Sequence, residues 1–207
     1  MYVLEKIIPA LSLVLIVSFY STASFSDEES PENIVKTNVN KVVDILKDKD
    51  LDEDQKRQSI YSIAKKHIDF EGMSRRILTV NWKKASDNQK VKFISLFETI
   101  LLDYYWARMK NYSGEHVQYL DSSIKKIKYA SVDTVIVRTE GVRFEGSKVE
   151  IPITYRMELK DGHWRAYDFL VENLSLVQNY RREYLPIVKN DGLEGLLDYM
   201  DQQIESS

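Results

Sequence analysis

Apolar residues recur at helical spacing through the first half of the chain. A first face, with intervals of four, three and four residues, carries Val35, Val39, Val42 and Leu46. Ser30 followed by Pro31 is typical of a helix start, because serine caps free amides and proline fits the first helical position. A second amphipathic helix is expected after Asp52, and its face carries Ile60, Ile63, Ala64 and Ile68.

A short helix and a long helix follow. The region 69–82 is expected to form a short helix and a connection, which contribute Phe70, Met73, Ile77 and Leu78. Ser86 and Gln89 have the spacing of a capping box, in which each side chain accepts a hydrogen bond from a backbone amide of the other residue. This box opens a long helix that ends near Gly114, and its apolar face carries Phe93, Phe97, Ile100, Leu101 and Tyr104.

The period changes to two after His116, which indicates strands. Between 149 and 159 apolar residues alternate with mostly polar ones, so that one side carries Val149, Ile151, Ile153, Tyr155, Met157 and Leu159. Pro152 has no amide hydrogen, so this strand is expected to be bent, bulged or near a sheet edge there. Asp161 and Gly162 predict a hairpin turn into a further strand that reaches Phe169.

Helical spacing returns in the last part of the chain. It runs from Leu174 to Leu185, and a last helix carries Leu193, Leu196, Leu197 and Met200. The order of helices, antiparallel strands and helices predicts an α+β fold whose sheet is covered by helices on one side.

The N-terminal segment at 7–20 is almost entirely apolar. As a helix it would be about 21 Å long, which is shorter than the ~30 Å hydrocarbon core of a membrane. Ser21 and Ala23 are small residues at the positions that signal peptidase requires, so we expect a cleaved secretory signal at 1–23, with a short uncleaved anchor as the alternative. A flexible tail at 24–30 and a single domain at 31–207 would follow.

Composition excludes several classes of protein. The 207 residues carry 29 Lys and Arg against 32 Asp and Glu, a formal net charge of −3, so the positive excess on which nucleic-acid binding depends is absent. The chain has no cysteine, which excludes disulfides, thiolate catalysis and cysteine-ligated zinc. Export without cysteine fits the periplasm, where a large core must supply the stability.

Candidate catalytic chemistry is sparse. His67, His116 and His163 have no metal-ligand spacing, and the glycines form neither a nucleophile elbow nor a phosphate loop. Asp168 and Glu172 are four residues apart, and paired carboxylates can do acid–base chemistry. Alternatively, Asp168 accepts hydrogen bonds from backbone amides where the strand meets the next helix. We therefore expect no enzyme activity and no metal. The competing hypothesis is an exported enzyme that uses Asp168 and a histidine as an acid–base pair.

The apolar surplus has two interpretations. The strand face with Ile151 and Ile153 is expected opposite the long helix with Phe93 and Phe97, and the two faces either pack together or line a cavity. Periodicity does not distinguish a filled core from a lined cavity.

Several stretches resemble one protein family. The central block carries Leu78, Trp82, Ala85, Ser86, Gln89, Phe93 and Phe97. A later strand reads WRAYD at 164–168, the next segment reads VENLSLVQNYR at 171–181, and LEGLL stands at 193–197. These motifs are similar to those of the MlaC family, the periplasmic phospholipid-binding component of the Mla lipid transport system, also described as toluene-tolerance or ABC-transporter auxiliary proteins. The resemblance covers essentially the whole chain after the signal segment.

Two positions depart from the family pattern. Thr79 and Asn173 stand where the family usually has glycine. Asparagine tolerates a left-handed backbone better than most residues, so the turn at Asn173 can be kept. Thr79 has no such tolerance, which puts the backbone path before Trp82 in question.

The resemblance implies a curved antiparallel sheet that packs against several helices around an apolar lipid pocket. It implies a carrier, without catalytic residues or cofactor, whose cargo is a bound phospholipid. The partners would be an outer-membrane lipoprotein–porin complex and the MCE-domain protein of an inner-membrane ABC transporter, and the role would be to maintain the lipid asymmetry of the outer membrane. The alternative is an exported adaptor subunit of an ABC transporter with a solid core and no ligand.

The resemblance and the patterns together select candidate site residues. The expected pocket wall consists of Phe93, Phe97, Leu101, Ile151, Ile153, Tyr155, Phe169 and Val177. Trp82, Trp164 and Tyr180 are expected to line the mouth or to brace the wall. Arg181 is a candidate contact for a headgroup or a partner, with a structural ion pair as the alternative.

Overall fold

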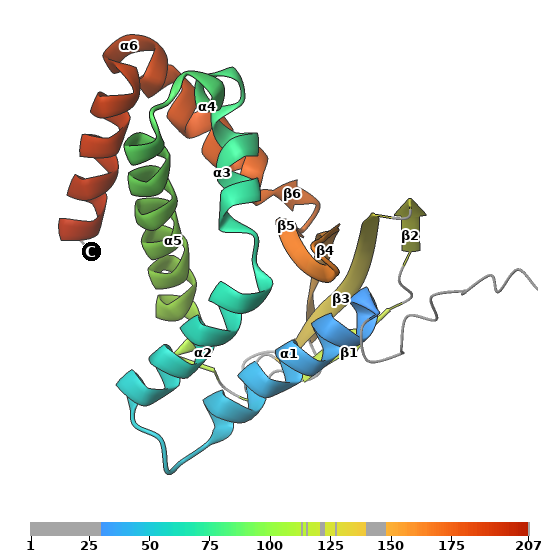
Figure 1. The fold of residues 1–207 in the computed structure, drawn as a ribbon. Coiled ribbons are helices and arrows are strands. Elements are labelled where there is room, and N and C mark those ends of the chain that lie inside the picture. Colours follow the sequence, from blue (N-terminus) through green and yellow to red (C-terminus); the bar gives the residue numbers. More distant parts are fainter. Residues whose placement is uncertain are drawn as a thin grey trace, which may run out of the picture.

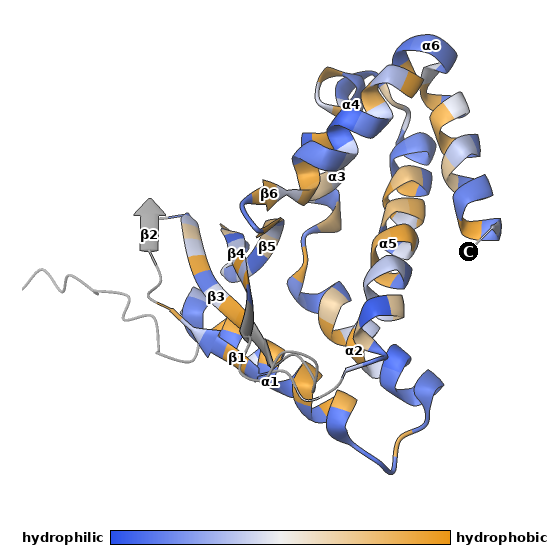
Figure 2. Ribbon diagram, turned by 180° about the vertical axis from the view of Figure 1, so that it is seen from behind, coloured by the Kyte–Doolittle hydropathy of each residue, from blue (hydrophilic) through white to orange (hydrophobic). Residues whose placement is uncertain are grey.

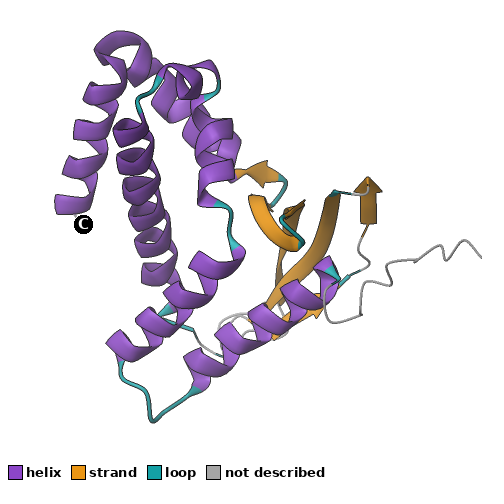
Figure 3. Cartoon of the chain, viewed as in Figure 1, coloured by secondary structure: helices purple, strands orange, loops and turns teal. Residues whose placement is uncertain are grey.

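The computed structural model describes residues 30–112, 114, 116–120, 123–126, 128–139 and 148–206. The expected signal at 1–23 and the tail up to residue 29 lie outside the described residues. The first helices run in the order α1 (Pro31–Lys47), α2 (Glu53–His67), α3 (Phe70–Leu78), α4 (Val80–Lys84) and α5 (Asp87–Met109). The strands are β1 (His116–Tyr119), β2 (Ser123–Lys126), β3 (Tyr129–Thr139), β4 (Lys148–Lys160), β5 (His163–Val171) and β6 (Leu174–Ser175), and α6 (Leu176–Glu205) follows them. This order confirms the expected α+β fold (Figure 1, Figure 3).

The helix starts are those that the capping residues predict. The side chain of Ser30 accepts a hydrogen bond from the Asn33 amide, with proline at the first position of α1. Asp52 and Ser86 both form complete capping boxes, at the starts of α2 and α5. Each box satisfies amides that the helix itself leaves free, which is why these boundaries can be read locally.

The sheet is antiparallel, with the order β1-β3-β4-β5-β6 and with β2 paired to β3. Strand β4 pairs with β3 from Lys148 to Glu158, whereas its pairing with β5 begins at Ile153. Pro152 therefore lies next to the end of one ladder, which confirms that it is near a local edge. The predicted turn between β4 and β5 is present, with positive φ angles of 52° at Asp161 and 80° at Gly162.

Two positive-φ residues mark the positions that differ from the family pattern. Asn173 has a φ of 65° in the turn between β5 and β6, as its tolerance of the left-handed region predicts. Thr79, with φ 54° and ψ −118°, forms the junction between α3 and α4. This conformation is costly for a β-branched residue, because its Cβ substituents crowd the backbone.

The last helical region consists of two segments. Gly192 has a φ of 74° and a ψ of −177°, so the backbone of α6 is not helical there. Figure 1 shows α6 turning back so that its last part lies beside α5. The two predicted C-terminal helices are thus both present, and they meet at this glycine.

The apolar interior is divided into two packed clusters. The larger lies between α3, α5 and α6 and contains Met73, Ile77, Phe93, Phe97, Tyr184, Leu196, Leu197 and Met200. The smaller joins the start of α1 to the sheet and contains Val35, Ala130, Val132, Met157 and Trp164. Figure 2 shows apolar residues along α1, α5 and the long strands.

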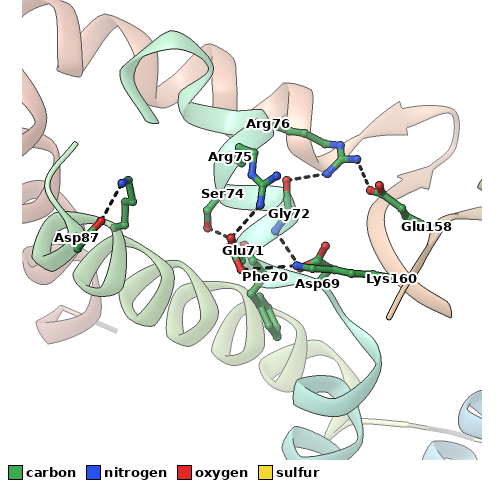
Figure 4. A network of polar contacts seen from close by, with 11 residues as sticks. Asp69, Phe70, Glu71, Gly72, Ser74, Arg75, Arg76, Asp87, Glu158 and Lys160 are labelled. Carbon is green, nitrogen blue, oxygen red and sulfur yellow. Dashed lines mark hydrogen bonds and ion pairs between the residues drawn. The ribbon is translucent and has the colours of Figure 1, made fainter. Parts of the chain in front are cut away.

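Polar contacts attach α3 to the strand β4 (Figure 4). Arg76 forms an ion pair with Glu158 at 2.6 Å, and Lys160 lies 3.5 Å from the buried carboxylate of Asp69. Asp69 also caps α3 by accepting a hydrogen bond from the Gly72 amide at 3.0 Å. These contacts therefore fix the position of the helical cluster relative to the sheet at this corner of the molecule.

Candidate functional site

A cavity of about 720 Å³ lies between α1, α2, the C-terminal half of α5 and the sheet. Its helical walls carry Ile34, Val39, Val42, Val43, Leu46, Ile60, Ile63, Ala64, Ile68, Leu101, Leu102, Tyr105 and Met109. Its sheet wall carries Val117, Ile136, Ile151, Ile153, Tyr155, Met157, Ala166, Phe169 and Val171. The volume falls in the range of small-molecule sites in proteins. A solid core, as the adaptor alternative requires, is contradicted by this cavity.

Side chains on the cavity walls are incompletely covered by protein. Ile151, Ile153 and Val42 are only partly buried, although they belong to apolar faces that point inward. By contrast, Phe93 and Phe97 in the packed cluster have no exposed surface. The apolar faces of α1 and of the sheet thus do not close on each other, and an apolar occupant would complete their burial.

Two tyrosines and one histidine that line the cavity are uncharged near neutral pH. Burial raises the pKa of Tyr155 to about 12 and that of Tyr105 to about 12. Burial lowers the pKa of His67 from its ordinary value, and the nearby charges of Lys66, Lys41 and Arg165 lower it further. The cavity interior therefore offers an uncharged, apolar environment.

Polar side chains attach the α2 wall to α5. Arg57 and Tyr61 both donate to the carboxylate of Asp103, and the Lys65 ammonium lies 2.7 Å from Glu98. Burial and the bond to Asp103 raise the pKa of Tyr61 to about 12. Exposed ion pairs of this kind contribute at most about 1 kcal/mol each, so this wall is held less firmly than a packed apolar contact would hold it.

Five of the eight expected wall residues line the cavity, namely Leu101, Ile151, Ile153, Tyr155 and Phe169. The alternation of β4 thus places its apolar side chains on the cavity side. Their role in binding a ligand stays a prediction.

The other three expected wall residues do not line the cavity. Phe93, Phe97 and Val177 belong to the packed cluster of α3, α5 and α6. The physical reason is that the apolar stripe of α5 is continuous, but its neighbours change along the helix. Its first half meets Tyr184 of α6, whose ring lies edge-on to Phe93 at 6.1 Å, whereas its second half faces the cavity.

None of the residues expected at the mouth or as braces is a lining residue of the cavity. Trp82 and Tyr180 pack against the larger cluster, and Trp164 belongs to the smaller one. Arg181 donates from Nε to the backbone carbonyl of Arg76 at 3.0 Å, so it secures the end of α3. The expectations of a headgroup contact and of an ion pair at Arg181 both find no support in this geometry.

The contributions of α1 and α2 were not among the expected wall residues. Their apolar faces were visible as periodic patterns, but a local pattern does not show which other element it meets. One signal in the sequence could have identified them as wall residues: both helices had an apolar stripe for which no packing partner was expected.

Asp168 has a structural role. Its buried carboxylate accepts hydrogen bonds from the Val177 amide at 3.1 Å and the Ser175 hydroxyl at 2.7 Å, and Arg156 lies 3.2 Å away. This confirms the interpretation in which the carboxylate binds backbone where β5 gives way to α6.

Within the described ranges, no group of three or more His, Asp or Glu side chains is arranged to hold a metal ion. No helix in the same ranges has the length and apolarity to cross a bilayer.

Comparison with known proteins places this geometry in a family. The sequence model of the MlaC protein family matches residues 36–202, which is most of the chain. The chain belongs to the MlaC family.

Two relatives illustrate the relationship. The MlaC intermembrane phospholipid transport system binding protein of Haemophilus influenzae is 20% identical over 137 residues, or 66% of this chain and 62% of that protein. The match therefore spans less than two thirds of that relative's length. A phospholipid-binding protein from Ralstonia solanacearum, solved in complex with a phospholipid, superposes with a TM-score of 0.70 at 20% identity and covers 84% of this chain and 97% of its own. The likeness to this structure shows a shared fold.

Proposed function

We propose that this MlaC-family chain is a periplasmic phospholipid carrier that holds the acyl chains in the cavity between α1, α2, α5 and the sheet. The observation that carries the proposal is a volume of about 720 Å³ lined almost entirely by apolar side chains. Family membership and the relatives that bind phospholipid support the choice of cargo. The secretory signal expected from the sequence at 1–23 supports the location.

The energetics explain why a carrier needs such a cavity. Each CH₂ group removed from water gains about 0.8 kcal/mol, so a chain of ~16 carbons represents on the order of 12 kcal/mol. A free phospholipid cannot cross the aqueous periplasm at a useful rate against that barrier. Apolar contacts can match the burial for chains of different lengths, because they have no directional requirement.

Release requires a partner that prefers a different conformation of the carrier. A ligand or partner shifts an equilibrium only by its differential affinity for the two states. The α2 wall is our candidate for the element that a partner displaces, because its exposed ion pairs to α5 exchange readily with water. We propose the MCE-domain protein of an inner-membrane ABC transporter and an outer-membrane lipoprotein–porin complex as the two docking partners, in a cycle that maintains outer-membrane lipid asymmetry.

The carrier does no covalent chemistry in this proposal. The competing enzyme hypothesis required Asp168 as an acid or base, and that carboxylate is occupied by hydrogen bonds at the start of α6. Phospholipid would be cargo, and the chain would need no cofactor.

Native mass spectrometry of the purified protein tests the proposal. We expect a co-purifying phospholipid on the unmodified chain, and its loss in Ile153→Glu, which places a charge against the apolar wall. Val91→Glu is the matched control, because Val91 is 68% exposed on α5 and outside the cavity. A folded Ile153→Glu protein that carries the same lipid as the control would remove Ile153 from the binding wall, and a consistently ligand-free unmodified protein would end the carrier proposal.

A further inference from the structure

The cavity has one fully cationic side chain among the lining residues that the structure describes. Arg108, in the last turn of α5, lines the cavity and is exposed, so it marks a side that is open to solvent. The neighbouring lining residues of α5 are Tyr105 and Met109. An apolar interior with a single arginine at its exposed side matches an amphiphile with an anionic group next to its chains.

The guanidinium of Arg108 is held in place. Its central carbon lies 3.4 Å from the centre of the Tyr104 ring, and Nη1 donates to the Tyr104 backbone carbonyl at 2.8 Å. Stacking on an aromatic ring and one backbone hydrogen bond restrict the side chain to few orientations. Less conformational freedom is then lost when the guanidinium binds a ligand.

The remaining donors of Arg108 are free to bind an anion. Arg57, Arg76 and Arg156 are paired with carboxylates, whereas no described carboxylate lies within ion-pair distance of Arg108. An arginine has five N–H donors in a planar fork, and the contact to Tyr104 uses one of them. This geometry suits two oxygens of one phosphate group.

A tyrosine hydroxyl lies close enough to feel this charge. Burial raises the pKa of Tyr105, and Arg108 opposes that rise, so the phenol and the guanidinium are electrostatic neighbours on the same wall. Together they form a polar edge on a mostly apolar cavity.

We propose that Arg108 binds the phosphate diester of the cargo lipid and so makes the cavity favour phospholipids over neutral diacylglycerols with the same chains. This inference rests on the proposed function, since it assigns a headgroup contact to the same cavity. Arg108 acts here as a specificity-determining residue, while the chains supply most of the affinity.

A competition experiment tests this assignment. Delipidated protein is incubated with vesicles that contain equal amounts of dioleoyl phosphatidylglycerol and dioleoylglycerol, and the bound lipids are quantified by extraction and mass spectrometry. For Arg108→Gln we expect the ratio of bound phospholipid to bound diacylglycerol to fall about five- to tenfold, as expected for the loss of a partly exposed charge-assisted contact. Arg108→Lys is expected to keep an intermediate ratio, because it retains the charge but not the fork.

The control is Arg182→Gln, which removes an exposed arginine of α6 that lies outside the cavity. Its ratio should equal that of the unmodified protein. Raising the ionic strength should lower the ratio for the unmodified protein and leave it unchanged in Arg108→Gln. The measurement on the unmodified protein does not depend on whether a variant is stable.

The outcomes separate this inference from the proposed function. If Arg108→Gln leaves the ratio unchanged, or reduces both lipids equally, the headgroup assignment is overturned while the carrier function stands. If excess inorganic phosphate displaces the bound phospholipid, Arg108 belongs to a free-anion site and the assignment is again overturned. If the unmodified protein binds neither lipid, the proposed function itself fails, and the assignment fails with it.

Discussion

Replacing Thr79 by glycine is expected to stabilise the protein. Thr79 joins α3 to α4 with φ 54° and ψ −118°, a conformation in which a β-branched side chain is strained. Its side chain makes no capping hydrogen bond to α4. Its amide donates to the Arg75 carbonyl at 3.0 Å, and a glycine amide would keep that bond.

The size of the effect follows from two opposing terms. Residues held in such a region of the backbone cost about 1–3 kcal/mol. Glycine gives the unfolded chain extra conformational entropy, which costs about 0.4–1 kcal/mol. With the middle value of each range, the free energy of unfolding of Thr79→Gly should rise by about 1.3 kcal/mol, and each kcal/mol corresponds to about 2–4 °C in Tm for a domain of this size.

Thermal and urea unfolding followed by circular dichroism measure this change. Thr79→Ala is the matched control, because it removes the branched atoms but keeps the Cβ that is strained at positive φ. It should gain less than the glycine variant. The reasoning is refuted if Thr79→Gly is no more stable than the unmodified protein, or if alanine stabilises as much as glycine.

Two further substitutions probe buried polar groups. Asp168→Asn should lower the free energy of unfolding by about 2–3 kcal/mol, because the amide cannot accept hydrogen bonds from Ser175, Val177 and Arg156 as the carboxylate does. A loss below about 0.5 kcal/mol in urea titrations would contradict the capping role. The folded Asp168→Asn protein should still carry lipid, which native mass spectrometry checks. Tyr184→Phe should leave stability unchanged or raise it by about 1 kcal/mol, because the hydroxyl is fully buried and has no partner among the described residues. A marked fall in Tm for Tyr184→Phe would show that the hydroxyl does have a stabilising hydrogen-bond partner.

The resemblance to the family pointed to Thr79 as a position where the backbone could be strained. The family pattern has glycine where this chain has threonine, and the structure has a positive φ at that residue. At Asn173 the same substitution of a glycine is accommodated, since asparagine enters the left-handed region at little cost. The two departures have different consequences because threonine is branched at Cβ and asparagine is not. The size of each consequence depends on the backbone angles, which the structure supplies.

The sequence by itself determined the local features of this protein. The caps at Ser30, Asp52 and Ser86, the turn at Asp161 and the inward side of β4 all depend on residues close together in the chain, and all are found in the structure. Such features are readable because capping, turn formation and alternation involve only neighbouring backbone groups.

Only the tertiary structure decided which apolar faces touch and which stand apart. Phe97 and Leu101 lie one helical turn apart on α5 and both belong to the packed cluster, yet only Leu101 also lines the cavity. Their patterns are equivalent, because hydrophobic periodicity reports that a face is turned away from water and not what covers it. What covers it depends on where α1, α2 and α6 come to rest, and those positions result from contacts between segments that are far apart in the chain. Along α1, Val35 packs against the sheet and the Leu46 carbonyl accepts a hydrogen bond from Lys56 of α2, while Val42 and Val43 line the cavity.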